Sequence, residues 1–127
     1  MSEVLLDSHV VLWLLADNKR LGRQTRGRIE RSAAVYVSAA STWELNLKSA
    51  LGKLELPAGF GDALTASGLK DLPVTRAHTL DSDLLSLPHR DPFDAILVAQ
   101  ARAEGLTFIT ADAKILDAWN EAVDAAS

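Results

Sequence analysis

Residues 4–15 read VLLDSHVVLWLL, a short apolar run that ends at Asp7 and leads at once into a second apolar run. The first run is typical of a buried strand, and the longer second run is typical of a buried helix. The stretch therefore predicts a strand over residues 4–6 and a helix over residues 10–15. Such strand-to-helix steps build α/β domains around a parallel sheet.

The same step recurs after the β-rich residues 35–37. Ser41 and Glu44 follow at the spacing of a capping box, so we expect Ser41 to cap a helix whose third residue is Glu44. Gly52 supplies the left-handed residue at which that helix ends. A last step joins a strand over residues 106–110 to a short helix over residues 113–118 that begins at Asp112.

A long helix is predicted over residues 95–103, with Asp91 as its N-cap, Pro92 in its first turn and Gly105 as its stop. Five weaker elements fill the rest of the chain: a helix over residues 21–32, a small helix around residue 63, an edge strand over residues 70–74, a helical stretch from Thr75 to Leu87 broken at Pro88, and an edge strand around residues 122–123. The pattern predicts one α/β domain over residues 1–127, with a parallel sheet of four to five short strands and helices on both faces.

Composition narrows the function. The chain has 127 residues, a formal net charge of −4 and no cysteine. An acidic chain is not expected to clamp nucleic acid over its whole surface, and the lack of cysteine excludes disulfides, thiolate metal sites and cysteine nucleophiles. The sequence shows neither a signal peptide nor a membrane-spanning run, so we expect a cytoplasmic protein.

Four acidic residues lie where predicted strands or loops lead into helices: Asp7, Glu44, Asp94 and Asp112. In open α/β sheets such positions gather at one edge. Two carboxylates 4 Å apart repel by about 4 kcal/mol at an effective dielectric constant near 20, and a divalent cation removes that cost. All-oxygen ligands suit Mg²⁺ or Mn²⁺, which can promote hydrolysis at phosphorus. Each acid alone is also explained as a helix cap, but four together favour a metal site.

Four motifs carry a resemblance to a known family: residues 5–9 (LLDSH) with Leu12 and Trp13, residues 38–44 (SAASTWE) with Lys48 and residues 51–54 (LGKL), residues 89–94 (HRDPFD) with residues 99–101 (AQA), and residues 110–112 (TAD). In this order they resemble the PIN-domain toxins of the VapC type. The resemblance implies a Mg²⁺- or Mn²⁺-dependent endoribonuclease of a type II toxin–antitoxin system, a cognate VapB-type antitoxin and a homodimer. It assigns the site to Asp7, Glu44, Asp94 and Asp112, with Asp91 as an accessory. The chain departs at Ala95, where close relatives commonly carry Arg.

Two further features bear on RNA. Thr110 could orient a carboxylate or a water through its hydroxyl, although a threonine in a strand is more often structural. Residues 18–31 are rich in basic side chains, and we expect four of them to contact RNA phosphates: Arg20, Arg23, Arg26 and Arg28. The alternative is that these basic side chains form a solvated helix face without a role in RNA binding. The competing function is a catalytically inactive PIN-like domain that only binds RNA or protein.

Overall fold

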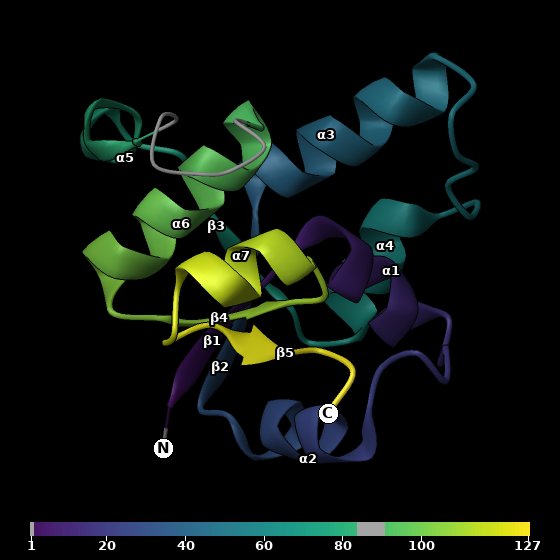
Figure 1. Ribbon diagram of the computed structural model, residues 1–127. Coiled ribbons are helices and arrows are strands. Elements are labelled where there is room, and N and C mark those ends of the chain that lie inside the picture. The colour runs from purple at the N-terminus through teal and green to yellow at the C-terminus, as the bar shows by residue number, and fades with distance from the viewer. Residues whose placement is uncertain (1, 84–90) are drawn as a thin grey trace.

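The computed structural model describes residues 2–83 and 91–127 (Figure 1). In chain order its elements are β1 (Glu3–Leu6), α1 (Ser8–Leu15), α2 (Arg23–Arg31), β2 (Ala34–Ser38), α3 (Ala39–Ala50), α4 (Phe60–Ala66), β3 (Lys70–Leu72), α5 (Arg76–Asp81), α6 (Pro92–Glu104), β4 (Thr107–Thr110), α7 (Ala113–Ala118) and β5 (Val123–Asp124). The predicted alternation of strands and helices is confirmed.

The described strands form one five-stranded parallel sheet in the order β3-β2-β1-β4-β5. The chain first builds outward from β1 through β2 to β3, and then crosses back to add β4 and β5 on the other side of β1. The order therefore reverses between β1 and β4. In open α/β sheets the crevice outside the carboxyl ends of such a strand pair is where ligands bind.

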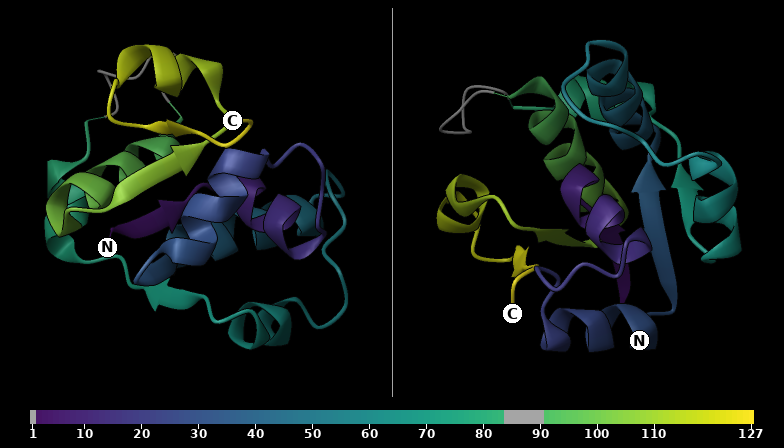
Figure 2. Two further views of the ribbon diagram at one scale, coloured as in Figure 1. Left: turned by 90° about the horizontal axis from the view of Figure 1, so that it is seen from below. Right: turned by 90° about the vertical axis from the view of Figure 1, so that its right-hand side faces the viewer.

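A hydrophobic core lies on each face of the sheet, as side chains that alternate along the strands require. Leu5 and Phe108 point to the core that α3, α6 and α7 cover, which contains Leu97 and Ile115. The opposite core, covered by α1, α2 and α4, takes the alternate strand residues with their helical partners: Val4, Leu6, Ile109, Val10, Val11, Ile29 and Leu64. Helices on both faces of the sheet, seen in the views of Figure 2, match the predicted layers.

The junction of β2 and α3 corrects one prediction. Ser38, not Ser41, caps α3, because its hydroxyl accepts the Ala40 N–H at 3.0 Å. The helix thus begins three residues before the expected point and Glu44 lies in its second turn, so the capping box is wrong. Ser41 is buried within the first turn, and its hydroxyl has no hydrogen-bond partner among the described residues.

Other element ends also shift. α1 begins at Ser8, two residues early, because the Asp7 carboxylate already caps it. β3 stops at Leu72, before Pro73, and lies at the sheet edge as predicted. α5 ends at Asp81 rather than continuing to Leu87, since Ser82 is extended; the remainder of that prediction, with Pro88, lies outside the described residues. In the part of the chain that the structure describes, no helix has the length and apolar character needed to cross a membrane.

Candidate active site

Five acidic side chains line one open hollow of about 310 Å³: Asp7, Glu44, Asp91, Asp94 and Asp112. His9, Trp13, Lys48 and Ala111 complete the described lining. Asp7 directly follows β1 and Ala111 directly follows β4, so the hollow lies at the carboxyl ends of the two strands between which the order reverses. We call it the carboxylate hollow. The structure brings together all four acids of the expected site and the accessory Asp91.

Thr110 connects the two acids that follow β1 and β4. Its hydroxyl donates to Asp7 Oδ2 at 2.6 Å and accepts the Asp112 N–H at 3.1 Å. The other oxygen of Asp7 accepts the Ser8 N–H at 2.7 Å. Asp112 in turn caps α7 by accepting the N–H groups of Lys114 and Ile115. Asp7 and Asp112 are therefore held at fixed positions by β4 and by the starts of two helices.

Asp91 and Asp94 share the first turn of α6 but differ in their contacts. Asp91 is the N-cap, as expected, because its Oδ1 accepts the Phe93 N–H at 2.8 Å and, more weakly, the Asp94 N–H at 3.4 Å. Asp94 is the third helical residue and is buried, with 8 % of its surface exposed. The pKa of Asp94 is raised to about 8, mainly by burial and in addition by the nearby charges of Asp7, Asp91, Asp112 and Glu44. Without a cation, this carboxyl group therefore holds a proton at neutral pH.

Burial also raises the pKa of Asp7. The hydrogen bonds from Thr110 and Ser8 oppose that rise, while the charge of Glu44 adds to it. The pKa values of Asp7 and Asp94 are thus both raised, as expected when like charges lie close together in a partly desolvated space. Strong perturbation of this kind in a hollow is typical of functional sites.

Glu44 is buried, and both of its carboxylate oxygens accept hydrogen bonds. The Ser8 hydroxyl donates to Oε1 at 2.6 Å, and the Lys48 ammonium donates to Oε2 at 2.5 Å. The hydrogen bond to Glu44 raises the pKa of Lys48, as do the charges of Glu44, Asp91 and Asp94. Lys48 is therefore a permanent positive charge on the wall of the carboxylate hollow.

Sequence reasoning did not assign Ser8 or Lys48 to the site. The four-residue spacing of Glu44 and Lys48 is the standard helical ion-pair signal and was available in the sequence. No comparable signal links Ser8 to Glu44, because that contact spans 36 positions of the chain and depends on how α1 packs beside α3.

The donor set fits Mg²⁺ or Mn²⁺. It offers carboxylate oxygens without thiolates, and a divalent cation relieves the repulsion between like charges that, after burial, raises the pKa of Asp94. Among the described residues, however, no three His, Asp or Glu side chains already stand in a geometry that would hold one ion. Asp7, Asp91 and Asp112 each give one oxygen to a helix start.

The four expected RNA-binding arginines separate in space. The Arg20 guanidinium lies 6.0 Å from the ring centre of Trp13, which lines the carboxylate hollow. Arg26 forms a 2.8 Å ion pair with Asp17. Arg23 and Arg28 line a different hollow of about 450 Å³, beside Ser127 and the end of the chain. Only Arg20 thus has a described contact with a residue of the carboxylate hollow.

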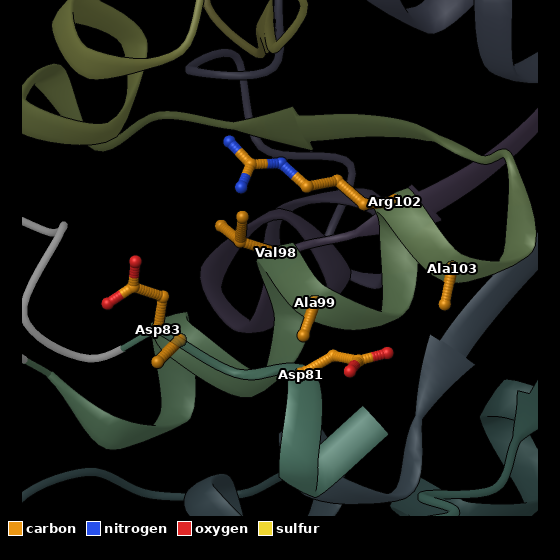
Figure 3. A pocket seen from close by; sticks show the side chains of 7 residues that line it. Asp81, Asp83, Val98, Ala99, Arg102 and Ala103 are labelled. Carbon is orange, nitrogen blue, oxygen red and sulfur yellow. The ribbon is translucent and has the colours of Figure 1, made fainter. Parts of the chain in front are cut away.

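Ala95 faces a third hollow, of about 240 Å³, between α5 and α6. Figure 3 shows the Arg102 guanidinium beside Val98, whereas the carboxylates of Asp81 and Asp83 point in different directions. These acidic groups do not converge as those of the carboxylate hollow do. The small side chain of Ala95 is buried at this place, so the departure from the family pattern leaves the carboxylate hollow itself unchanged.

A doubly wound parallel sheet with acidic side chains at its reversal point is typical of phosphate-directed, metal-dependent chemistry. The chain belongs to the PIN domain family, whose model matches residues 4–119. The resemblance found in the sequence is thereby confirmed for the family and for the fold. No curated protein matches the chain.

Solved structures share this fold over nearly the whole chain. A toxin–antitoxin complex from Klebsiella pneumoniae aligns with a TM-score of 0.63 at 17 % identity, covering 96 % of this chain and 97 % of that one. VapBC2 from Rickettsia felis, bound to a DNA fragment from its promoter, aligns with a TM-score of 0.63 at 13 % identity and covers 96 % of each chain. FitAcB from Neisseria gonorrhoeae aligns with a TM-score of 0.59 at 20 % identity and covers 95 % of each chain.

Proposed function

We propose that this chain is a Mg²⁺- or Mn²⁺-dependent endoribonuclease, the toxin of a type II toxin–antitoxin system that acts on RNA in the cytoplasm. The observation that carries the proposal is the convergence of Asp94 with four other carboxylates in one hollow, where burial first and these charges second raise its pKa to about 8. A protein that kept these groups only as helix caps would have no need to crowd them, because Ser, Thr and Asn cap helices equally well.

The proposed metal ligands are Asp7, Glu44, Asp94 and Asp112. When bound, the cation would neutralise these charges and promote attack of water on the phosphodiester phosphorus. The chain's own residues prepare the site. Thr110 fixes the Asp7 carboxylate through one oxygen, and Asp91 holds the start of α6 so that Asp94 stays in the hollow.

An antitoxin of the VapB type is the proposed protein partner. This proposal is supported by the family and by the aligned structures, among which are a toxin–antitoxin complex and a VapBC complex. In the cell, this antitoxin would keep the nuclease inactive until the antitoxin itself is removed.

We also propose a homodimer, with a second copy covering an apolar face of α3. Trp43, Leu47 and Leu51 follow one another at four-residue spacing and are exposed, Trp43 by 63 %. Trp43 also lines an almost wholly apolar hollow of about 520 Å³, together with Val74, Phe93 and Ile96 among others. Exposed apolar patches of this kind mark interaction surfaces. Sedimentation equilibrium of the isolated chain tests this, with a mass twice 13.7 kDa as the expected result.

The proposed nuclease activity is tested with metal-free protein and a labelled single-stranded RNA. We expect no cleavage in EDTA, cleavage when Mg²⁺ or Mn²⁺ is restored, and none from Asp112→Asn with either ion. Loss of the Asp112 charge relieves repulsion, so the variant should melt no lower than the parent in the absence of metal. Full cleavage in excess EDTA would overturn the metal requirement.

The inactive PIN-like domain is the alternative outcome of the same experiment. It is favoured by the absence, among the described residues, of a preformed three-ligand geometry. RNA binding without cleavage at any concentration of Mg²⁺ or Mn²⁺ would establish it.

A further inference from the structure

Lys48 is a charged group of the carboxylate hollow that metal binding by the acids does not use. Its ammonium lies on the hollow's wall with about a third of the side chain exposed. An ammonium has three N–H donors. Among the described residues, only Glu44 accepts one of them. The remaining two donors are free to take a further acceptor.

The position of this ammonium is fixed by a short chain of hydrogen bonds. Ser8, which is buried, donates to Glu44 Oε1, and Glu44 Oε2 accepts from Lys48. Glu44 is only 4 % exposed, so it cannot follow the lysine into solvent. A flexible lysine would normally lose much rotamer freedom on contacting a ligand. Here part of that ordering is already in place before any ligand arrives.

The charges that line the hollow indicate what kind of acceptor the free N–H groups of Lys48 would bind. The carboxylate hollow contains five acidic residues, and Lys48 is the one Lys or Arg in its described lining. The carboxyl groups of the hollow repel an anionic substrate, whereas the Lys48 ammonium attracts it.

We propose that Lys48 is a substrate-binding residue that donates a hydrogen bond to a non-bridging phosphate oxygen of the RNA at the carboxylate hollow. The inference rests on the proposed nuclease function and names the residue that holds its substrate. Glu44 then has a second task besides the proposed metal binding, because it positions the Lys48 ammonium.

The test measures RNA binding separately from cleavage. The probe is a fluorescent single-stranded oligoribonucleotide, titrated in EDTA at several salt concentrations, with the parent chain, Lys48→Met and Lys48→Arg. Loss of one phosphate contact lowers the slope of log K against log salt by about 0.7 for a single strand. We expect this decrease for Lys48→Met, equal on unrelated sequences, and recovery of the slope in Lys48→Arg.

Lys70→Met is the matched control. Lys70 is exposed on the edge strand β3 and does not line the carboxylate hollow, so the same change of charge there should leave the slope unaltered. Steady-state cleavage with Mg²⁺ gives a second measurement. Because the contact is made with the bound substrate, Lys48→Met should raise KM while kcat changes little.

The outcomes separate this inference from the function on which it rests. If the parent cleaves RNA and Lys48→Met matches it in slope and in KM, Lys48 does not bind substrate and the nuclease function stands. If Lys48→Met lowers kcat and leaves KM and slope unchanged, its role is structural and the proposal is again wrong. If the parent neither binds nor cleaves RNA, both proposals are overturned. Melting temperatures of all variants identify any that misfold, and Lys48→Arg then decides the question.

Discussion

At the scale of single residues, Asp91 and Asp94 lie in the same helical turn but have different roles. Asp91 satisfies backbone N–H groups that a helix start would otherwise leave unpaired, whereas Asp94 carries a pKa of about 8 among other carboxylates. The first residue stabilises the fold by its contacts. The second costs stability unless it is protonated or paired with a cation.

We therefore expect opposite results from substituting the two residues. Asp91→Ala should cost about 1 kcal/mol of unfolding free energy, since it removes an N-cap, and should retain partial activity. Asp94→Asn should keep or raise the melting temperature of the metal-free protein and abolish RNA cleavage. Thermal melts and a cleavage assay on both variants check this. A stable but inactive Asp91→Ala together with an active, less stable Asp94→Asn would reverse the assignment.

The raised pKa of Asp94 also predicts how stability depends on pH. The folded carboxyl group titrates near 8 and the unfolded one near 3.8, so between these values the folded state binds the extra proton. Unfolding free energy must then fall as pH rises from about 4 to about 8. The raised pKa of Asp7 acts in the same direction.

Urea unfolding of the metal-free protein at several pH values measures this effect, with Asp94→Asn as the comparison. The difference in stability, Asp94→Asn minus parent, should grow with pH because the variant has no carboxyl group to ionise. A difference that stays constant across this range would show that the Asp94 carboxyl is not protonated in the folded state.

At the scale of elements, the sequence predicted best those helices whose signals are local. α6 has its N-cap Asp91, Pro92 at the next position and Gly105 in a left-handed conformation at its end, and each signal acts within one turn. The start of α3 was misplaced because Ser38 and Ser41 are both able to cap a helix. Which one does so depends on where β2 ends, and the pairing of Ser38 with Leu72 of β3 extends β2 to that residue.

The basic face of α2 provides a prediction at this scale. Arg23 and Arg28 are exposed and line a hollow separate from the carboxylate hollow. They can therefore contribute to RNA binding only if the RNA extends from the carboxylate hollow to α2. Under the proposed role, the double variant Arg23→Gln, Arg28→Gln should flatten the salt dependence of RNA binding by about 1.4 in the log–log slope, equally on unrelated sequences.

The melting temperature of the double variant should change little, because exposed charges contribute little to stability. The salt dependence of RNA binding by Arg20→Gln is the comparison, since Arg20 lies over Trp13 at the carboxylate hollow. An unaltered salt slope in the double variant would mean that this face of α2 is solvated or contacts protein.

At the scale of the whole molecule, the class of the fold could be predicted but the strand order could not. Hydrophobic runs indicate that residues 4–6 and 106–110 form strands, yet nothing local states that they are neighbours. Their pairing joins Leu5 to Phe108, and it emerges only when the cores on both faces of the sheet close. The carboxylate hollow depends on that pairing. This is why the sequence could predict the acids, their common edge and a carboxylate-orienting role for Thr110, but not which carboxylate Thr110 contacts or that Ser8 reaches Glu44.

The hydrogen bond from Thr110 to Asp7 spans 103 positions of the chain, and it has a consequence for protein synthesis. Domains begin to fold from the N-terminus while the ribosome is still adding residues. A nascent chain that has not yet reached residue 107 lacks β4, and with it the partner that fixes Asp7. Assembly of the hollow must therefore wait until the ribosome has added the residues of β4. Under the proposed nuclease function, a chain built in this order cannot cleave RNA before β4 has been synthesised.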